Sequence, residues 1–169
     1  EIGGSRTQGA GRKTAQIARS GIAHMPQGDA IFLGLTVRQH LYTGAFSNSA
    51  WRQKKERMDE VLEIFPPLRK LLDIPAGKIS GGERRMTSLG RGLMGDCNVY
   101  LIDEPSLGLA PKISKSVIDA LKKVQLTNGA MIIAEQNLNL IEGFVDRLVG
   151  MHAGEITGAV LENELLGGG

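Results

Sequence analysis

The sequence predicts an α/β fold, in which a mostly parallel sheet packs against helices and a helical segment interrupts the alternation. After residue 95, apolar runs of strand length alternate with helix-length segments, as is typical of parallel sheets. Between residues 33 and 95 the apolar residues mostly recur at helical spacing instead, which favours helices alone. The 169 residues, 41% of them hydrophobic, are enough to bury a core.

The first half of the chain is predicted to hold one strand followed by helices. Residues 15–19 are weakly helical, and residues 21–25 form a short apolar strand. Thr36 and Gln39 match the S/T-x-x-E/Q capping box, so a helix is expected to begin there. A charged amphipathic helix is expected over 51–65, where two prolines end it. Its apolar face holds Met58, Val61, Leu62 and Phe65.

The second half is predicted to alternate helices and strands. Helices are expected at 82–94, 112–125 and 138–143, and strands at 99–102, 130–134, 147–151 and 155–161. The run at 99–102 is short, apolar and rich in strand formers, which suits a central parallel strand buried on both faces. The last two strands flank a turn at 152–154 that contains glycine.

Composition excludes several classes of function. The formal charge is only +2 and aromatic residues make up 4% of the chain, which argues against nucleic-acid binding. Cys97 is the single cysteine and cannot form an internal disulfide. No apolar stretch approaches the roughly 20 residues that a membrane-spanning helix needs. The basic pairs Lys54-Lys55 and Arg84-Arg85 are expected on solvated helix faces.

A segment suited to holding a phosphate begins the helix expected at 82–94. Ser80 and Glu83 match the capping box, and Gly81 and Gly82 carry no side chain that would keep an anion from the exposed N–H groups. A helix N-terminus with unused donors attracts anions. Taken alone, the segment is also typical of an ordinary capped helix, so that alternative stays open.

Two adjacent carboxylates follow the strand expected at 99–102. Asp103 and Glu104 stand at its carboxyl end, where ligands of open α/β sheets bind. One carboxylate can hold Mg²⁺, directly or through water, while the other polarises an attacking water. A strand end with two solvated acids is the alternative, and it is weakened by the phosphate-type helix start shortly before.

The order of these segments resembles that of the nucleotide-binding subunits of ABC transporters. Four stretches carry the resemblance: 25–28 to the Q-loop, 79–83 to the signature motif, 99–105 to Walker B and 106–109 to the D-loop. Further stretches, PSLGLAP at 105–111 and AEQN at 134–137, are most similar to the LivF-type ATPases of branched-chain amino acid uptake. Relatives that import urea or other amides share much of this pattern.

The resemblance implies a P-loop-NTPase-like ABC ATPase core with a helical subdomain. Residues 1–32 would be the remaining part of the N-terminal core with the Q-loop, 33–95 the helical subdomain that ends in the signature helix, and 96–169 the α/β core with Walker B, the D-loop and the switch. The implied function is the ATP-binding and ATP-hydrolysing subunit of an importer for branched-chain or related amino acids.

The resemblance also implies the ligands, ATP and Mg²⁺, and the role of each site residue. Glu104 would act as general base or water-positioning group, and Gln136, at the switch position that is histidine in much of the family, would contact the γ-phosphate. Asp103 would organise Mg²⁺, and Gln27 would touch metal and water. The signature residues Ser80, Gly81, Gly82 and Glu83 would bind the γ-phosphate of ATP held by a second subunit.

Partners follow from the same resemblance. A second ABC ATPase subunit, identical or different, would complete the nucleotide site, and transmembrane permease subunits would dock between the Q-loop and residues 36–65. A substrate-binding protein would act indirectly, and no nucleic acid is implied. The subunit would be peripheral, at the cytoplasmic face of the membrane.

The Walker A motif is the main departure from the family pattern. A phosphate loop requires G-x-x-x-x-G-K-[ST] between an apolar strand and a helix. Residues 7–14, TQGAGRKT, include Lys13 and Thr14 but have Thr7 and Arg12 where glycines are required. We therefore expect an incomplete core that is inactive alone. A truncated, non-catalytic interaction module is the alternative. An ABC ATPase of DNA repair is a further candidate, but it would carry long insertions between the Q-loop and the signature motif, and the sequence has none there.

Overall fold

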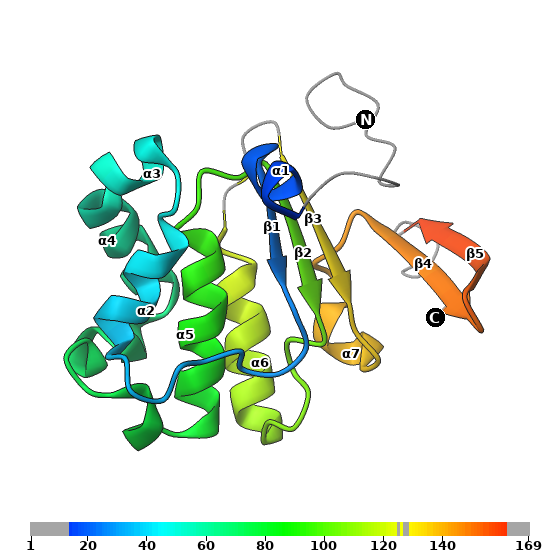
Figure 1. The fold of residues 1–169 in the computed structure, drawn as a ribbon. Coiled ribbons are helices and arrows are strands. Elements are labelled where there is room, and N and C mark those ends of the chain that lie inside the picture. Colours follow the sequence, from blue (N-terminus) through cyan, green and yellow to red (C-terminus); the bar gives the residue numbers. More distant parts are fainter. Residues whose placement is uncertain (1–13, 125, 127–128, 162–169) are drawn as a thin grey trace. The chain divides into compact units, whose positions relative to one another are not determined.

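The computed structural model describes residues 14–124, 126 and 129–161 (Figure 1). The chain divides into two compact units, the first ending at Gln136 and the second beginning at Asn137, and each is described by itself. All but Thr14 of the TQGAGRKT stretch lies outside the described residues, so the expectation about a phosphate loop stays a prediction.

A parallel sheet with strand order β1-β2-β3 organises the first unit. Its strands are β1 (Ile22–Met25), β2 (Val99–Asp103) and β3 (Ala130–Ala134), and the short helix α1 (Thr14–Arg19) precedes β1. Val99 pairs with Ile22 on one side and with Ala130 on the other. Because the strands are parallel and nearly in register, their carboxyl ends meet at one edge, which confirms the predicted α/β fold.

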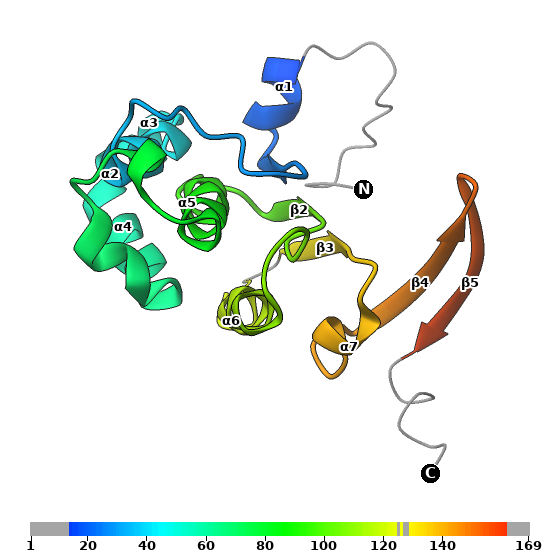
Figure 2. The same ribbon diagram turned by 90° about the horizontal axis from the view of Figure 1, so that it is seen from below.

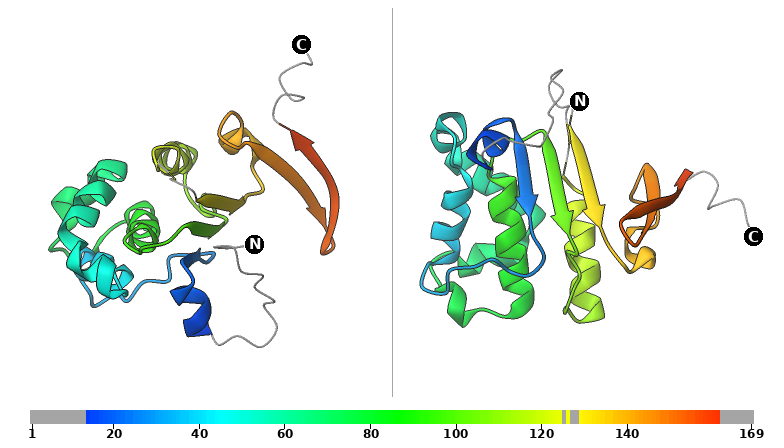
Figure 3. Two further views of the ribbon diagram at one scale, coloured as in Figure 1. Left: turned by 90° about the horizontal axis from the view of Figure 1, so that it is seen from above. Right: turned by 45° about the vertical axis from the view of Figure 1, so that its right-hand side comes forward.

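Helices α5 (Gly81–Leu93) and α6 (Pro111–Leu121) lie along one face of this sheet (Figures 2 and 3). Met25 packs so closely on α5 that a Cβ atom at Gly92 would lie 2.3 Å from the Met25 Cε atom. On the opposite face Leu101 is half-buried and the Ile132 side chain is 61% exposed. The expectation that β2 is buried on both faces is therefore wrong for the described chain.

All elements between residues 33 and 95 are helical, as predicted. They are α2 (Val37–Gly44), α3 (Asn48–Arg52), α4 (Lys54–Ile64), the 3-10 helices η1 (Pro66–Leu71) and η2 (Ala76–Lys78), and α5. The capping box of Thr36 and Gln39 is present in full. The four apolar residues expected on one helical face, Met58, Val61, Leu62 and Phe65, are all buried.

The single helix expected over 51–65 is wrong, because two helices stand there. The Ser47 hydroxyl accepts a hydrogen bond from the N–H of Ala50 and begins α3 three residues earlier than expected. Gln53 then leaves helical geometry, with φ −96° and ψ 14°, and separates α3 from α4. The Ser47 cap accounts for the earlier start of α3, whereas no side chain caps α4 at Gln53.

Glycines let α5 approach its neighbours closely. A Cβ atom at Gly44 of α2 would lie 1.8 Å from the carbonyl oxygen of Arg91 in α5, and one at Gly90 of α5 would lie 2.8 Å from Val61 Cγ1. Around this contact lie the largest fully buried side chains of the helical region, among them Leu41, Phe65, Leu68 and Leu89. The helix that starts at the signature residues is therefore packed into the core.

The second unit holds α7 (Leu138–Ile141) and an antiparallel hairpin of β4 (Arg147–His152) and β5 (Glu155–Leu161). Ala153 and Gly154 both have positive φ, as a two-residue turn between antiparallel strands requires. The predicted hairpin is confirmed. In neither unit does the described chain contain a helix of sufficient length and apolarity to cross a membrane.

Candidate functional site

The carboxyl edge of the sheet gathers three of the residues selected from the sequence. Gln27 follows β1, Glu104 follows β2, and Gln136 follows β3. The Gln27 amide donates a hydrogen bond from Nε2 to Glu104 Oε2 over 2.7 Å. The Gln136 amide donates from Nε2 to Glu104 Oε1 over 2.5 Å. Both oxygens of one carboxylate are thus held by amides from the two neighbouring strand ends.

The backbone of Glu104 adopts a left-handed conformation, with φ +42°, which costs about 1–2 kcal/mol for a residue with a side chain. Its N–H donates to the carbonyl oxygen of Ala134 over 2.9 Å, and its own carbonyl accepts from the N–H of Leu107 over 3.2 Å. These bonds turn the chain sharply at the end of β2. As a result the Glu104 side chain reaches toward both glutamines.

Asp103 is the last residue of β2 and immediately precedes Glu104 in the sequence. The residue is half-buried. Its carboxylate and the amide oxygen of Gln27 are the hard oxygen donors that Mg²⁺ prefers. Within the described ranges no three His, Cys, Asp or Glu side chains converge to hold a metal ion. Mg²⁺ is usually bound through one or two protein carboxylates together with phosphate and water oxygens, so this donor set fits it.

The signature segment forms the predicted capping box. Ser80 Oγ accepts a hydrogen bond from the N–H of Glu83 over 3.3 Å, and Glu83 Oε2 accepts one from the N–H of Ser80 over 2.8 Å. The box does not use the N–H groups of Gly81 and Gly82, which open the first turn of α5. Ser80 and Glu83 bond to each other and not to the glutamine–glutamate cluster.

The two signature glycines differ in their surroundings. A Cβ atom at Gly81 would meet only Arg84 Nη2, at an ordinary contact distance of 3.8 Å. A Cβ atom at Gly82 would lie 2.6 Å from Ile113 Cγ2 in α6. Gly82 is therefore required by helix packing, whereas the space beside Gly81 fits the anion-binding interpretation.

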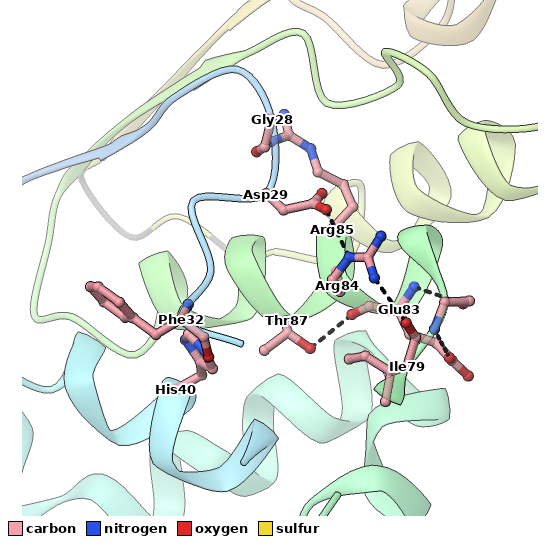
Figure 4. A network of polar contacts seen from close by, with 10 residues as sticks. Gly28, Asp29, Phe32, His40, Ile79, Glu83, Arg84, Arg85 and Thr87 are labelled. Carbon is pink, nitrogen blue, oxygen red and sulfur yellow. Dashed lines mark hydrogen bonds and ion pairs between the residues drawn. The ribbon is translucent and has the colours of Figure 1, made fainter. Parts of the chain in front are cut away.

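Arg85 corrects a prediction, because it is buried and does not lie on a solvated helix face, whereas the Arg84 side chain stays 32% exposed. Arg85 is only 2% exposed, and its guanidinium donates to backbone carbonyls on both sides of Gln27 and around Glu104. Arg84 forms an ion pair with Asp29 over 3.1 Å and also donates to the carbonyl of Ile79 (Figure 4). Both side chains thus hold the Q-loop segment against α5.

Burial lowers the pKa of the Arg85 guanidinium, and the nearby carboxylates of Asp29, Asp103 and Glu135 oppose that shift. Arginine nevertheless stays protonated in proteins. A permanent positive charge is therefore buried under the carboxyl ends of the strands. A sequence signal for it exists: Arg85 lies four and eight residues before Leu89 and Leu93, in the stripe that α5 buries.

Comparisons with known proteins identify the family of this chain. The family model described as "ABC transporter" matches residues 2–107. The chain is 36% identical over 155 residues to the high-affinity branched-chain amino acid transport ATP-binding protein BraG of Pseudomonas aeruginosa, covering 89% of this chain and 66% of that protein. It is 33% identical over 150 residues to the probable branched-chain amino acid transport ATP-binding protein LivF of Archaeoglobus fulgidus, with coverages of 86% and 62%.

Solved structures show the same fold. An ATP-binding cassette of an ABC transporter in its ADP conformation matches with a TM-score of 0.74 at 24% identity, covering 92% of this chain and 66% of that one. A nucleotide-free cassette matches with a TM-score of 0.73 at 21% identity, covering 91% and 67%. The chain spans less than two thirds of the length of the two transport proteins named above.

Proposed function

The chain belongs to the ABC transporter family, and on this premise we propose that it is the ATP-binding and ATP-hydrolysing subunit of an importer for branched-chain or related amino acids. The names of the relatives BraG and LivF support the substrate class. The observation that carries the activity is the Glu104 carboxylate, held on both oxygens by Gln27 and Gln136 at the carboxyl edge of the sheet.

Glu104 is the proposed general base or water-positioning group. Its two amide partners cannot exchange protons near neutral pH, so they orient the carboxylate and leave it able to accept a proton. Each carboxylate oxygen has a second acceptor direction in addition to the bond it already makes. An attacking water can therefore be held at Glu104 while Gln136, next to it, contacts the γ-phosphate.

Asp103 and Gln27 are the proposed residues at the metal. When bound, Mg²⁺ neutralises charge on the β- and γ-phosphates. Asp103 supplies a carboxylate for it, and Gln27 can present its amide oxygen because its Nε2 atom already donates to Glu104. Gln27 thereby connects the metal position with the water position.

The signature residues Ser80, Gly81, Gly82 and Glu83 are proposed to act on ATP bound by a second ABC subunit. The capping box holds the first turn of α5 in a defined shape, and the N–H groups of Gly81 and Gly82 remain as donors for a phosphate. Since this segment and the Glu104 cluster make no shared hydrogen bond, each can serve a different nucleotide.

The remaining partners are proposed to bind at the surface next to the Q-loop. Exposed apolar side chains lie between the Q-loop and α2, with Phe32 65% and Leu33 63% exposed. This surface, together with residues 36–65, suits the docking of transmembrane permease subunits, with a substrate-binding protein acting indirectly. The subunit would then lie peripherally at the cytoplasmic face of the membrane.

The decisive experiment is Mg-ATP hydrolysis by the polypeptide assembled with its transporter partners. Replacing Glu104→Gln should reduce kcat by about 100-fold or more, because general bases contribute at least that much. The control Glu155→Gln, an exposed residue of β5, should hydrolyse ATP at the unchanged rate. A Glu104→Gln variant with unreduced kcat would refute the assignment.

A second candidate, the non-catalytic interaction module, is favoured by the stretch TQGAGRKT, which lacks two motif glycines. On this proposal the isolated 169 residues bind ATP poorly and do not hydrolyse it. Hydrolysis by the isolated chain, abolished by Glu104→Gln, would contradict it and would support the catalytic candidate alone.

A further inference from the structure

Arg85 joins three segments that are far apart in the sequence. It lies in the second turn of α5 and uses all of its guanidinium donors on backbone carbonyls. Nε donates to Pro105 over 3.2 Å, Nη1 to Pro26 over 3.0 Å and to Gly28, and Nη2 to Asp103 over 2.7 Å and to Glu104 over 3.0 Å. Five acceptors match the five N–H donors of arginine.

We propose that Arg85 is a positioning residue that fixes the relative placement of Gln27 and Glu104 from α5. Pro26 and Gly28 flank Gln27 directly, so the Nη1 atom holds the backbone on both sides of that glutamine. The Nη2 atom holds the carbonyls of Asp103 and Glu104. The catalytic consequence of this inference rests on the proposed function.

Arg85 contacts the left-handed backbone of Glu104 and stabilises it. A non-glycine residue with φ +42° persists only where surrounding contacts hold it. The carbonyl groups on either side of the Glu104 α-carbon, those of Asp103 and Glu104, converge on the single Nη2 atom. Hydrogen bonds to a charged donor are stronger than neutral ones, so Arg85 stabilises the turn that presents the Glu104 carboxylate.

Other side chains cannot reproduce this arrangement. The planar guanidinium directs donors to opposite sides at fixed angles, whereas lysine offers three donors from one point. Arg85→Lys keeps the buried positive charge but cannot reach the Q-loop and Walker B carbonyls together. Arg85→Met keeps the approximate volume and removes every donor. The two variants therefore separate the charge from the geometry.

Hydrogen exchange tests the inference without any nucleotide, so its outcome is independent of the proposed function. In Arg85→Met the N–H groups of Glu104 and Leu107 should exchange about tenfold faster, because a lost charged hydrogen bond is worth that factor. In Arg85→Lys the exchange rates of these N–H groups should lie between those of the wild type and those of Arg85→Met. The N–H groups of Leu89 and Gly90, inside α5, should keep their protection, and Arg69→Met, at an exposed arginine of η1, should match the wild type.

Unchanged exchange rates at the N–H groups of Glu104 and Leu107 would overturn the inference. An equal increase in the exchange rates along α5 would overturn it as well, because it would mean that Arg85 has a role in folding only. If Arg85→Met does not fold, Arg85→Lys decides by the same two criteria. In the assembled protein we expect kcat to fall about tenfold in Arg85→Lys with KM nearly unchanged. A raised KM with wild-type kcat would equally overturn it.

Discussion

Gly81 and Gly82 offer a direct test of how the signature helix is packed. Replacing Gly82→Ala places a Cβ atom 2.6 Å from Ile113 Cγ2, a separation that real Cβ atoms do not tolerate. Isoleucine is stiff at its β-branch, so the methyl group cannot swing aside at little cost. Replacing Gly81→Ala places the new atom 3.8 Å from the end of the flexible Arg84 side chain. Neither glycine has a positive φ.

The two substitutions should therefore change the free energy of unfolding in different ways. Overpacking of this kind costs about 1–3 kcal/mol, which we expect for Gly82→Ala. Gly81→Ala should be neutral or stabilising by up to about 1 kcal/mol, because alanine restricts the unfolded chain. In a chain of this size each kcal/mol shifts Tm by about 2–4 °C.

Urea unfolding at equilibrium measures both variants, and a double-mutant cycle identifies the contact. Ile113→Leu removes the Cγ2 methyl and keeps the side-chain volume, so it should cost under about 1.5 kcal/mol alone. Combined with Gly82→Ala, it should restore most of the lost stability. Equal effects at both glycines, or no recovery in the double variant, would refute the packing of α5 on α6 through Gly82.

Two further predictions concern the helical region. Ser80→Ala removes the hydroxyl that accepts from the N–H of Glu83 and should lower the free energy of unfolding by about 1 kcal/mol. The control Ser116→Ala, at an exposed position in α6, should change that free energy little. An equal loss of stability in both variants would contradict the stabilising role of the cap. The Arg38 guanidinium holds the pKa of Asp73 below its ordinary value. The ion pair therefore stabilises the fold fully when the pH is above the ordinary pKa of aspartate. This contribution is lost as the pH falls through the depressed pKa. Unfolding measured from pH 7 to 3 should show a shallower acid decline for Asp73→Asn; an identical slope would contradict the ion pair.

Local chemistry explains which predictions were confirmed. The capping boxes at Thr36 and Ser80 depend on residues three apart in sequence, and both formed. The strands at β2 and β3 were found because their apolar runs are short and clearly bounded. The single helix predicted over 51–65 is wrong because the chain begins a helix earlier, at the Ser47 cap, and leaves helical geometry at Gln53.

Other features depend on partners that are distant in sequence. Arg85 was predicted to be solvated, since a charged pair early in a helix is usually exposed. Its acceptors lie at residues 26–28 and 103–105, and only folding brings them together. Gly82 likewise has a packing reason that depends on α6.

The sequence by itself determined the α/β fold, the order of the motifs and the candidate site residues. These features depend on patterns among residues close together in the sequence and not on tertiary contacts. Only the tertiary structure decided how they meet. Parallel pairing of three strands brings Gln27, Glu104 and Gln136 to one edge, and a left-handed turn directs the Glu104 carboxylate between the two amides. That geometry results from backbone hydrogen bonds between segments far apart in the sequence, such as the bond from the N–H of Glu104 to the carbonyl of Ala134, which no local pattern encodes.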